Sequence, residues 1–147
     1  MSSNTSVIID AKGLILGRMA SDVAKRLLDG ESVIILNAEK TAISGKKQHI
    51  VTDAKTFLEV GHPRKGPNHP RRPDKIVSRT IRGMLPRRKP KGIQAFKRLR
   101  VYLGVPVEFE GKNIQTITEA STGKLKAPYI TVGDLAKEIG DWNPEVD

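Results

Sequence analysis

The chain has 147 residues and a formal net charge of +10, with 26 Lys and Arg residues against 16 acidic residues. It contains no cysteine, which excludes a disulfide framework and a thiolate metal site and fits a reducing compartment. It also lacks a signal-peptide pattern and any apolar stretch of the roughly 20 residues that cross a membrane, so we expect one cytoplasmic domain, residues 1–147.

The first 36 residues predict a strand, a helix and a second strand. The apolar run 7–9 is typical of a buried strand, and from residue 18 to 28 apolar side chains recur at helical spacing until Gly30. Residues 32–36, SVIIL, form a continuous run typical of a strand that is covered on both faces. This βαβ pattern indicates an α/β fold with parallel strands.

The middle of the chain predicts a turn, a helix and a proline-rich loop. A turn around residues 44–45 is followed by helical spacing over residues 50–58, and Gly61 marks the end of that helix. Four prolines within residues 62–73 remove backbone donors and fix φ, which favours an extended loop with exposed cations.

A two-faced helix is predicted for residues 74–85, followed by a cationic turn that Pro86 begins. We expect a short helical turn over residues 93–99 and then a strand at 101–103. The expected cationic face of the helix contains Lys75, Arg79 and Arg82. The expected packed face contains Val77, Ile81, Met84 and Leu85.

The C-terminal part predicts an edge strand and a capped helix. Residues 105–111 alternate like an edge strand, and loops are expected after them. Thr131 and Asp134 have the spacing of a capping box, and Ile130 could pack on Leu135 before Gly140 ends the helix.

One weaker pattern could indicate a nucleotide-binding enzyme. The turn GLILGRMAS, residues 13–21, lies between a strand and a helix, but its glycines are too close together and Arg18 stands where a P-loop requires Lys. A tight turn is therefore favoured over a phosphate loop.

Neither the histidines nor the strand-end carboxylates predict a site. His49, His62 and His69 have no cysteine partner and no spacing typical of a metal site. Asp10 and Glu39 follow the first two predicted strands but lack a nucleophile or base, so we assign no catalytic residue, cofactor or metal.

The strongest signal is the basic block, residues 61–100. It holds fourteen Lys or Arg and one acid, Asp74, a local charge of +13 that leaves −3 for the other 107 residues. Such density favours a nucleic-acid partner over a merely solvated face. Nine of the cations are Arg, whose planar fork suits the phosphates of folded RNA. Within the block, the predicted RNA contacts are Arg64, Lys65, Arg71, Arg72, Lys75, Arg79, Arg82, Arg87, Arg88, Lys89, Lys91, Lys97 and Arg98.

Four segments resemble, in the same order, the L-thirteen family of large-subunit ribosomal proteins. They are LGRMASDVAKRLL (16–28), VIILNAEKTAISGKK (33–47), TIRGMLPRRKPKG (80–92) and LRVYLGVP (99–106). The resemblance is strong over residues 7–106 and weak for the C-terminal helix, and PRRKPKG looks like the archaeal form.

The resemblance implies a three-layer α/β/α fold with a small, mostly parallel four-stranded sheet and a basic loop-helix extension. It further implies a non-enzymatic protein that binds 23S-type ribosomal RNA, supports subunit assembly and touches neighbouring large-subunit proteins, with no membrane or small-molecule substrate. Family RNA contacts carry over to Arg18, Lys46, Lys47, Arg82, Arg87, Arg88, Lys89 and Lys91. The alternatives are a small nucleotide-binding α/β enzyme and a DNA-binding, chromatin-like protein.

Overall fold

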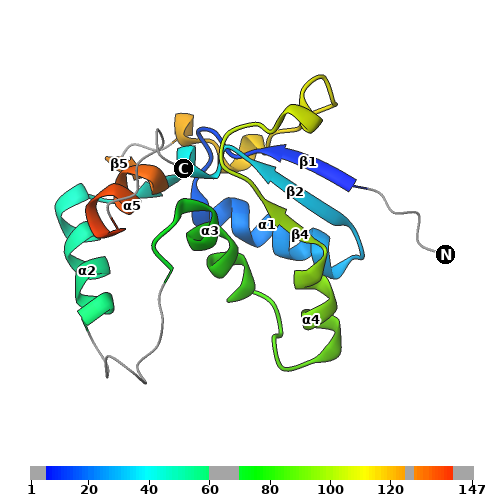
Figure 1. The fold of residues 1–147 in the computed structure, drawn as a ribbon, viewed down its shortest axis with the longest axis horizontal. Helices are drawn as coiled ribbons and strands as arrows, with labels where there is room; N and C mark the ends of the chain where they lie inside the picture. The colour runs from blue at the N-terminus through cyan, green and yellow to red at the C-terminus, as the bar shows by residue number, and fades with distance from the viewer. Residues whose placement is uncertain (1–5, 60–69, 125–127, 141–147) are drawn as a thin grey trace.

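The structure is a computed structural model and describes residues 6–59, 70–124 and 128–140 (Figure 1). The strands are β1 (Ser6–Asp10), β2 (Ser32–Leu36), β3 (Ala42–Ser44), β4 (Leu99–Val101) and β5 (Tyr129–Thr131). The helices are α1 (Leu16–Leu28), α2 (Lys47–Glu59), α3 (Pro73–Arg82), α4 (Pro90–Lys97) and α5 (Val132–Gly140). Short 3-10 turns are η1 (Ala38–Lys40), η2 (Val107–Phe109), η3 (Thr118–Ala120) and η4 (Thr122–Lys124). None of the helices in these described ranges has the length and apolarity to cross a membrane.

The main sheet is parallel, which confirms the α/β prediction. Its strand order is β1-β2-β4, and Val7 lies opposite Val33 in the register of the first pair. The resemblance implies a four-stranded sheet, but the described main sheet has three strands. The strand β3 instead pairs antiparallel with β5 in a separate ribbon. Asn37 adopts a left-handed φ of 58° directly after β2, and η1 follows it, so the chain turns out of the sheet before β3 begins.

Side chains that alternate along the strands separate the two faces of the main sheet. Val33 and Ile35 belong to a buried cluster that also contains residues of α1, α3, α4 and α5. On the opposite face Ile8 and Leu36 form a smaller cluster with Phe109 of η2, and no residue of the described α-helices belongs to it. The helical layer therefore covers one face of the main sheet, and η2 covers the other face. The three-layer fold that the resemblance implies would place helices on both faces.

The edge strand expected at residues 105–111 is wrong. Pro106 precedes the 3-10 turn η2, and the amide of Phe109 donates to the Pro106 carbonyl oxygen at 3.0 Å. Phe109 is buried with its ring centroid 5.3 Å from that of Tyr102, while Val107 is 82% exposed. The apolar alternation thus reflects one aromatic anchor in a loop rather than a pleated strand.

The basic region also differs in detail from the expected elements. The expected short helical turn is the helix α4, and the strand after it begins at Leu99, two residues earlier than predicted. Met84 is 43% exposed and does not share the packed face of Val77 and Ile81, because α3 ends at Arg82 and the helical phase is lost.

The predicted N-cap of the C-terminal helix α5 is confirmed. The amide of Asp134 donates to the Thr131 hydroxyl oxygen at 3.1 Å.

Candidate nucleic-acid interface

The helix α3 presents one apolar and one cationic face, as predicted. Val77 and Ile81 are fully buried against the core, and each such side chain contributes roughly 1.5–3 kcal/mol through burial. Lys75 and Arg79 are exposed on the other side, and Arg82 is half-buried at the last position. Pro73 at the first helical position has a suitable φ and Asp74 lies in the first turn, where the helix dipole favours an acid. The core therefore anchors a row of cations.

A closed turn connects α3 to α4 and carries Arg87, Arg88 and Lys89, all exposed. The amide of Lys89 donates to the Pro86 carbonyl oxygen at 3.0 Å, and the amides of Gly92 and Ile93 donate to the Lys89 carbonyl oxygen. These bonds hold the turn in a defined shape, and α4 packs against the core through the fully buried Ala95.

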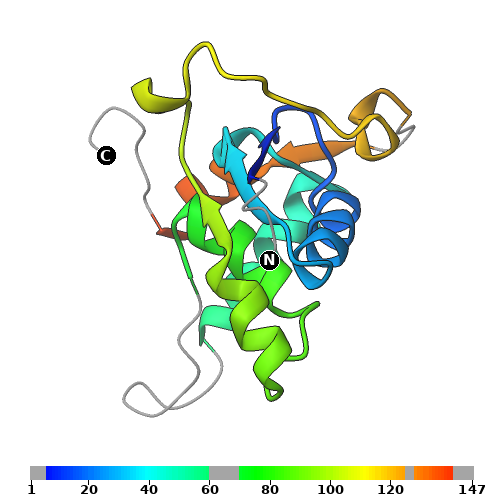
Figure 2. The same cartoon turned by 90° about the vertical axis from the view of Figure 1, so that its right-hand side faces the viewer.

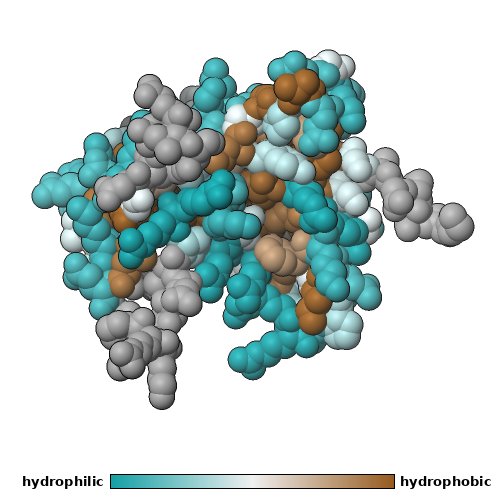
Figure 3. All heavy atoms as spheres, in the orientation of Figure 1, coloured by the Kyte–Doolittle hydropathy of each residue, from teal (hydrophilic) through white to brown (hydrophobic). Residues whose placement is uncertain are grey.

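We call residues 73–97 the basic hairpin, because the chain runs along α3, reverses at the turn and returns along α4 (Figures 1 and 2). In Figure 3 hydrophilic side chains project from the lower side of the molecule, where Figure 1 places α3 and α4. The hairpin carries eight cations and one acid. Its cations are Lys75, Arg79, Arg82, Arg87, Arg88, Lys89, Lys91 and Lys97.

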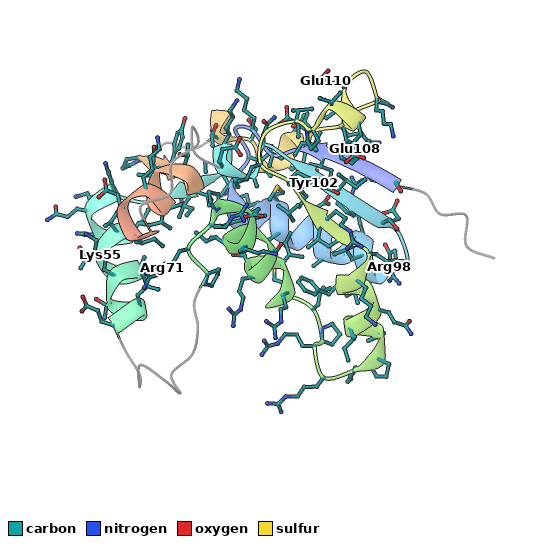
Figure 4. All side chains as sticks on the ribbon, in the orientation of Figure 1. Lys55, Arg71, Arg98, Tyr102, Glu108 and Glu110 are labelled. Atoms are coloured by element: carbon teal, nitrogen blue, oxygen red, sulfur yellow. The ribbon has the colours of Figure 1, made fainter. Side chains whose placement is uncertain are left out.

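Three further predicted contacts in the basic block have structural partners. Arg98, labelled in Figure 4, is half-buried and its Nη2 donates to the Leu27 carbonyl oxygen at 2.5 Å, at the end of α1. Arg72 Nε lies 3.4 Å from Asp74 Oδ1, and the Arg71 side chain lies against Gly140 at the end of α5. Arg98 and Arg71 connect elements of the fold, whereas the Arg72 pair is local to the start of α3. Of the three, only Arg71 and Arg72 are exposed enough to offer their heads to a polyanion as well.

The remaining predicted contacts lie away from the hairpin. Lys46 and Lys47 are exposed at the start of α2, on the other side of the molecule from α4 in Figure 1, and Lys47 Nζ lies 3.5 Å from Glu138 Oε1. Arg18 is exposed on the first turn of α1. Arg64 and Lys65 lie outside the described residues.

The glycine-containing turn before α1 is not available to a phosphate. The amides of Gly13, Leu14 and Ile15 donate to the carbonyl oxygens of Lys40, Ala11 and Ala120, respectively. Leu14 and Ile15 are themselves buried. A phosphate loop needs free amides that point outward, so this turn is a structural connection, as predicted.

The two strand-end carboxylates also serve the fold. Asp10 Oδ1 accepts hydrogen bonds from the Asn37 side-chain amide at 2.9 Å and from the Lys12 amide at 3.0 Å. The Glu39 carboxylate accepts from the Gly104 amide at 3.0 Å. Among the described residues no cluster of metal-ligating side chains occurs, and His49 is exposed on α2.

Sequence reasoning missed two residues of this region. Gly92 lies inside α4 directly beside Pro86, and a glycine within a helical pattern is a recognisable signal of close approach. Arg100 is exposed at β4 and belongs to the basic block, but its Nη1 bonds to the carbonyl oxygens of Lys97 and Leu99. Gly92 permits the close approach of α4 to the turn, whereas Arg100 stays close to its own backbone.

Comparison with known proteins gives a consistent result. Residues 4–108 match the family described as "Ribosomal protein L13". The chain is 50% identical over 141 residues to "Large ribosomal subunit protein uL13" of Methanocaldococcus jannaschii, with 90% of this chain and 96% of the relative covered. It is 46% identical to the protein of that name from Saccharolobus solfataricus, with 93% of each chain covered. The corresponding protein of Methanococcoides burtonii is 43% identical, with 90% and 96% covered. All three organisms are archaea, which agrees with the predicted archaeal form.

Proposed function

Because the chain belongs to the ribosomal protein L13 family, we propose that it is a non-enzymatic constituent of the large ribosomal subunit that binds 23S-type ribosomal RNA and supports subunit assembly. Its partners are that RNA and neighbouring large-subunit proteins, and its location is the cytoplasm.

The observation that carries the proposal is the basic hairpin. Eight cations occur in 25 residues with a single acid, on two helices whose apolar sides are buried in the core and on the turn between them. Repulsion among these charges is relieved when phosphates take the place of counterions, and release of those counterions drives binding. A rigid cationic hairpin on a compact domain suits a groove or cleft between RNA segments.

The mode of binding follows from the side-chain types in the hairpin. Phe96 is its only aromatic residue and is partly buried in the core, so base stacking on aromatic rings contributes little. Arginine and lysine heads on a fixed scaffold recognise the spacing of phosphates, and hence the shape of folded RNA.

Competition binding tests this assignment. The purified protein is bound to labelled large-subunit ribosomal RNA, and unlabelled duplex DNA or structured ribosomal RNA is then added. We expect ribosomal RNA to compete at far lower concentration than duplex DNA of equal nucleotide content. Equal competition would indicate a general polyanion or chromatin-like binder, and ATP or GTP binding without RNA preference would indicate the nucleotide-binding enzyme.

A further inference from the structure

A polar recess lies beside α1, away from the basic hairpin. It has a volume of about 460 Å³, which falls in the range of roughly 300–1,000 Å³ typical of sites for small ligands. Its lining combines one face of α1 with η3, which lie next to each other in Figure 2. The lining residues are Arg18, Ser21, Asp22, Lys25, Ile117, Glu119 and Ala120.

The walls of the recess are held in place by backbone bonds. The Ile15 amide at the start of α1 donates to the Ala120 carbonyl oxygen at 2.7 Å, and the Ala120 amide donates to the Ile117 carbonyl oxygen at 3.0 Å. Ala120 is buried, and Ile117 packs on the edge of the core. The recess is therefore part of the folded domain and does not depend on a ligand for its shape.

The charges of the recess are arranged asymmetrically. Asp22 pairs with Arg26 at 3.0 Å, so its charge is offset from outside the lining. Arg18 and Lys25 are exposed on α1 without a salt bridge to any described residue. Glu119, on the facing turn, likewise forms no ion pair within the described part of the chain. Two cations thus share the recess with one uncompensated carboxylate.

We propose that this recess binds one unpaired nucleotide of the ribosomal RNA, an inference that rests on the proposed function. Arg18 and Lys25 hold the phosphate, the partly exposed side chain of Ile117 supports the base, and Glu119 accepts a hydrogen bond from an exocyclic amino group. Single-stranded bases splayed out of RNA are the usual targets of such base-edge contacts. A carboxylate repels a phosphate that binds beside it, so Glu119 opposes phosphate binding by Arg18 and Lys25 unless it has a partner of its own on the RNA. The amino group of a base can be that partner, because it donates hydrogen bonds to a carboxylate.

The decisive test is whether Glu119→Gln raises or lowers the affinity for ribosomal RNA. If Glu119 only faces RNA phosphates, Glu119→Gln removes a repulsive charge and raises affinity. If Glu119 accepts from a base, the same isosteric change weakens a charge-assisted bond, and we expect affinity for large-subunit ribosomal RNA to fall about three- to tenfold. Glu108→Gln is the matched control, because Glu108 is an exposed acid on η2, the 3-10 turn on the other side of the sheet (Figure 4).

Lys25→Ala provides an independent readout, with Lys137→Ala on α5 as its control. We expect Lys25→Ala to weaken RNA binding several-fold more than Lys137→Ala, and ultraviolet cross-linking of wild type to place nucleotide adducts on residues 18–25 or 117–120. If Glu119→Gln binds the ribosomal RNA as tightly as wild type or more tightly, the recess assignment is overturned. The proposed function still stands in that case, because wild type binds the RNA. Competition by excess free ATP overturns it as well, since it would show a site for a soluble nucleotide. Absence of any RNA binding by wild type overturns both.

Discussion

Gly92 in α4 lies so close to Pro86 that a Cβ atom added at Gly92 would overlap the Pro86 carbonyl group. The contact involves backbone atoms, so rotation of a side chain cannot relieve it. It joins the first residue of the cationic turn to the helix that follows and fixes the turn carrying Arg87, Arg88 and Lys89. Only glycine permits this approach.

We expect Gly92→Ala to force the turn away from α4, to lower the free energy of unfolding by about 1–3 kcal/mol, and to weaken RNA binding. Gly83→Ala is the matched control, because an added Cβ there meets its nearest atoms at 3.5 Å and the φ is −64°. Denaturant unfolding measures the stability of both variants, and filter binding measures their affinity for RNA. Equal behaviour of the two variants would show that the turn tolerates the displacement.

The hairpin cations are tested by removing Arg87, Arg88 and Lys89 together. Because these side chains are exposed, the triple alanine variant should fold normally, bind ribosomal RNA more weakly and show a salt dependence less steep by about 2–3 units. The control removes three exposed lysines elsewhere, at positions 40, 112 and 137. Equal losses in the two triple variants would mean that net charge, and not the hairpin, determines binding.

Arg98 should act mainly on stability. Its Nη2 donates to the Leu27 carbonyl oxygen at the end of α1, and Arg98→Ala removes this charged hydrogen bond and leaves the carbonyl oxygen with the Gly30 amide alone. We expect a loss of about 1–3 kcal/mol in the free energy of unfolding. Arg100 is an exposed residue whose bonds are local, so Arg100→Ala should change stability by no more than about 0.5 kcal/mol. A small stability effect combined with a large RNA-binding defect for Arg98→Ala would instead make Arg98 a direct contact.

Asp10 should likewise prove structural. Asp10→Ala leaves the buried Asn37 amide without its acceptor and should cost about 1–3 kcal/mol, measured by urea unfolding. Asp10→Asn can keep an acceptor oxygen at the same position and should cost less. Wild-type stability in Asp10→Ala would contradict the structural assignment.

Periodicity predicted most of the fold because the elements have one buried side. The βαβ unit, α2, the stripe of Val77 and Ile81, and the cap at Thr131 all follow from local patterns. The pairing of β3 with β5 could not be predicted, because each is three residues long and they lie far apart in the chain. The sequence wrongly predicts a strand for the loop anchored by Phe109, because one buried aromatic between exposed residues gives the same alternation.

The sequence also predicted part of the candidate site, because that part depends on a local pattern. Charge density marks the basic hairpin directly, since exposed cations need no tertiary partner to be recognised. Sequence alone could not show that Arg98 bonds to Leu27, or that Arg18 shares a recess with Glu119, because both relationships join segments distant along the chain.

The salt dependence of RNA binding tests the central claim most directly. If the hairpin and its neighbours engage six to eight phosphates, the logarithm of the association constant should fall against the logarithm of salt concentration with a slope on the order of −4 to −7. The measurement uses the wild-type protein and large-subunit ribosomal RNA across a series of monovalent salt concentrations. A slope near zero would contradict phosphate recognition by this surface.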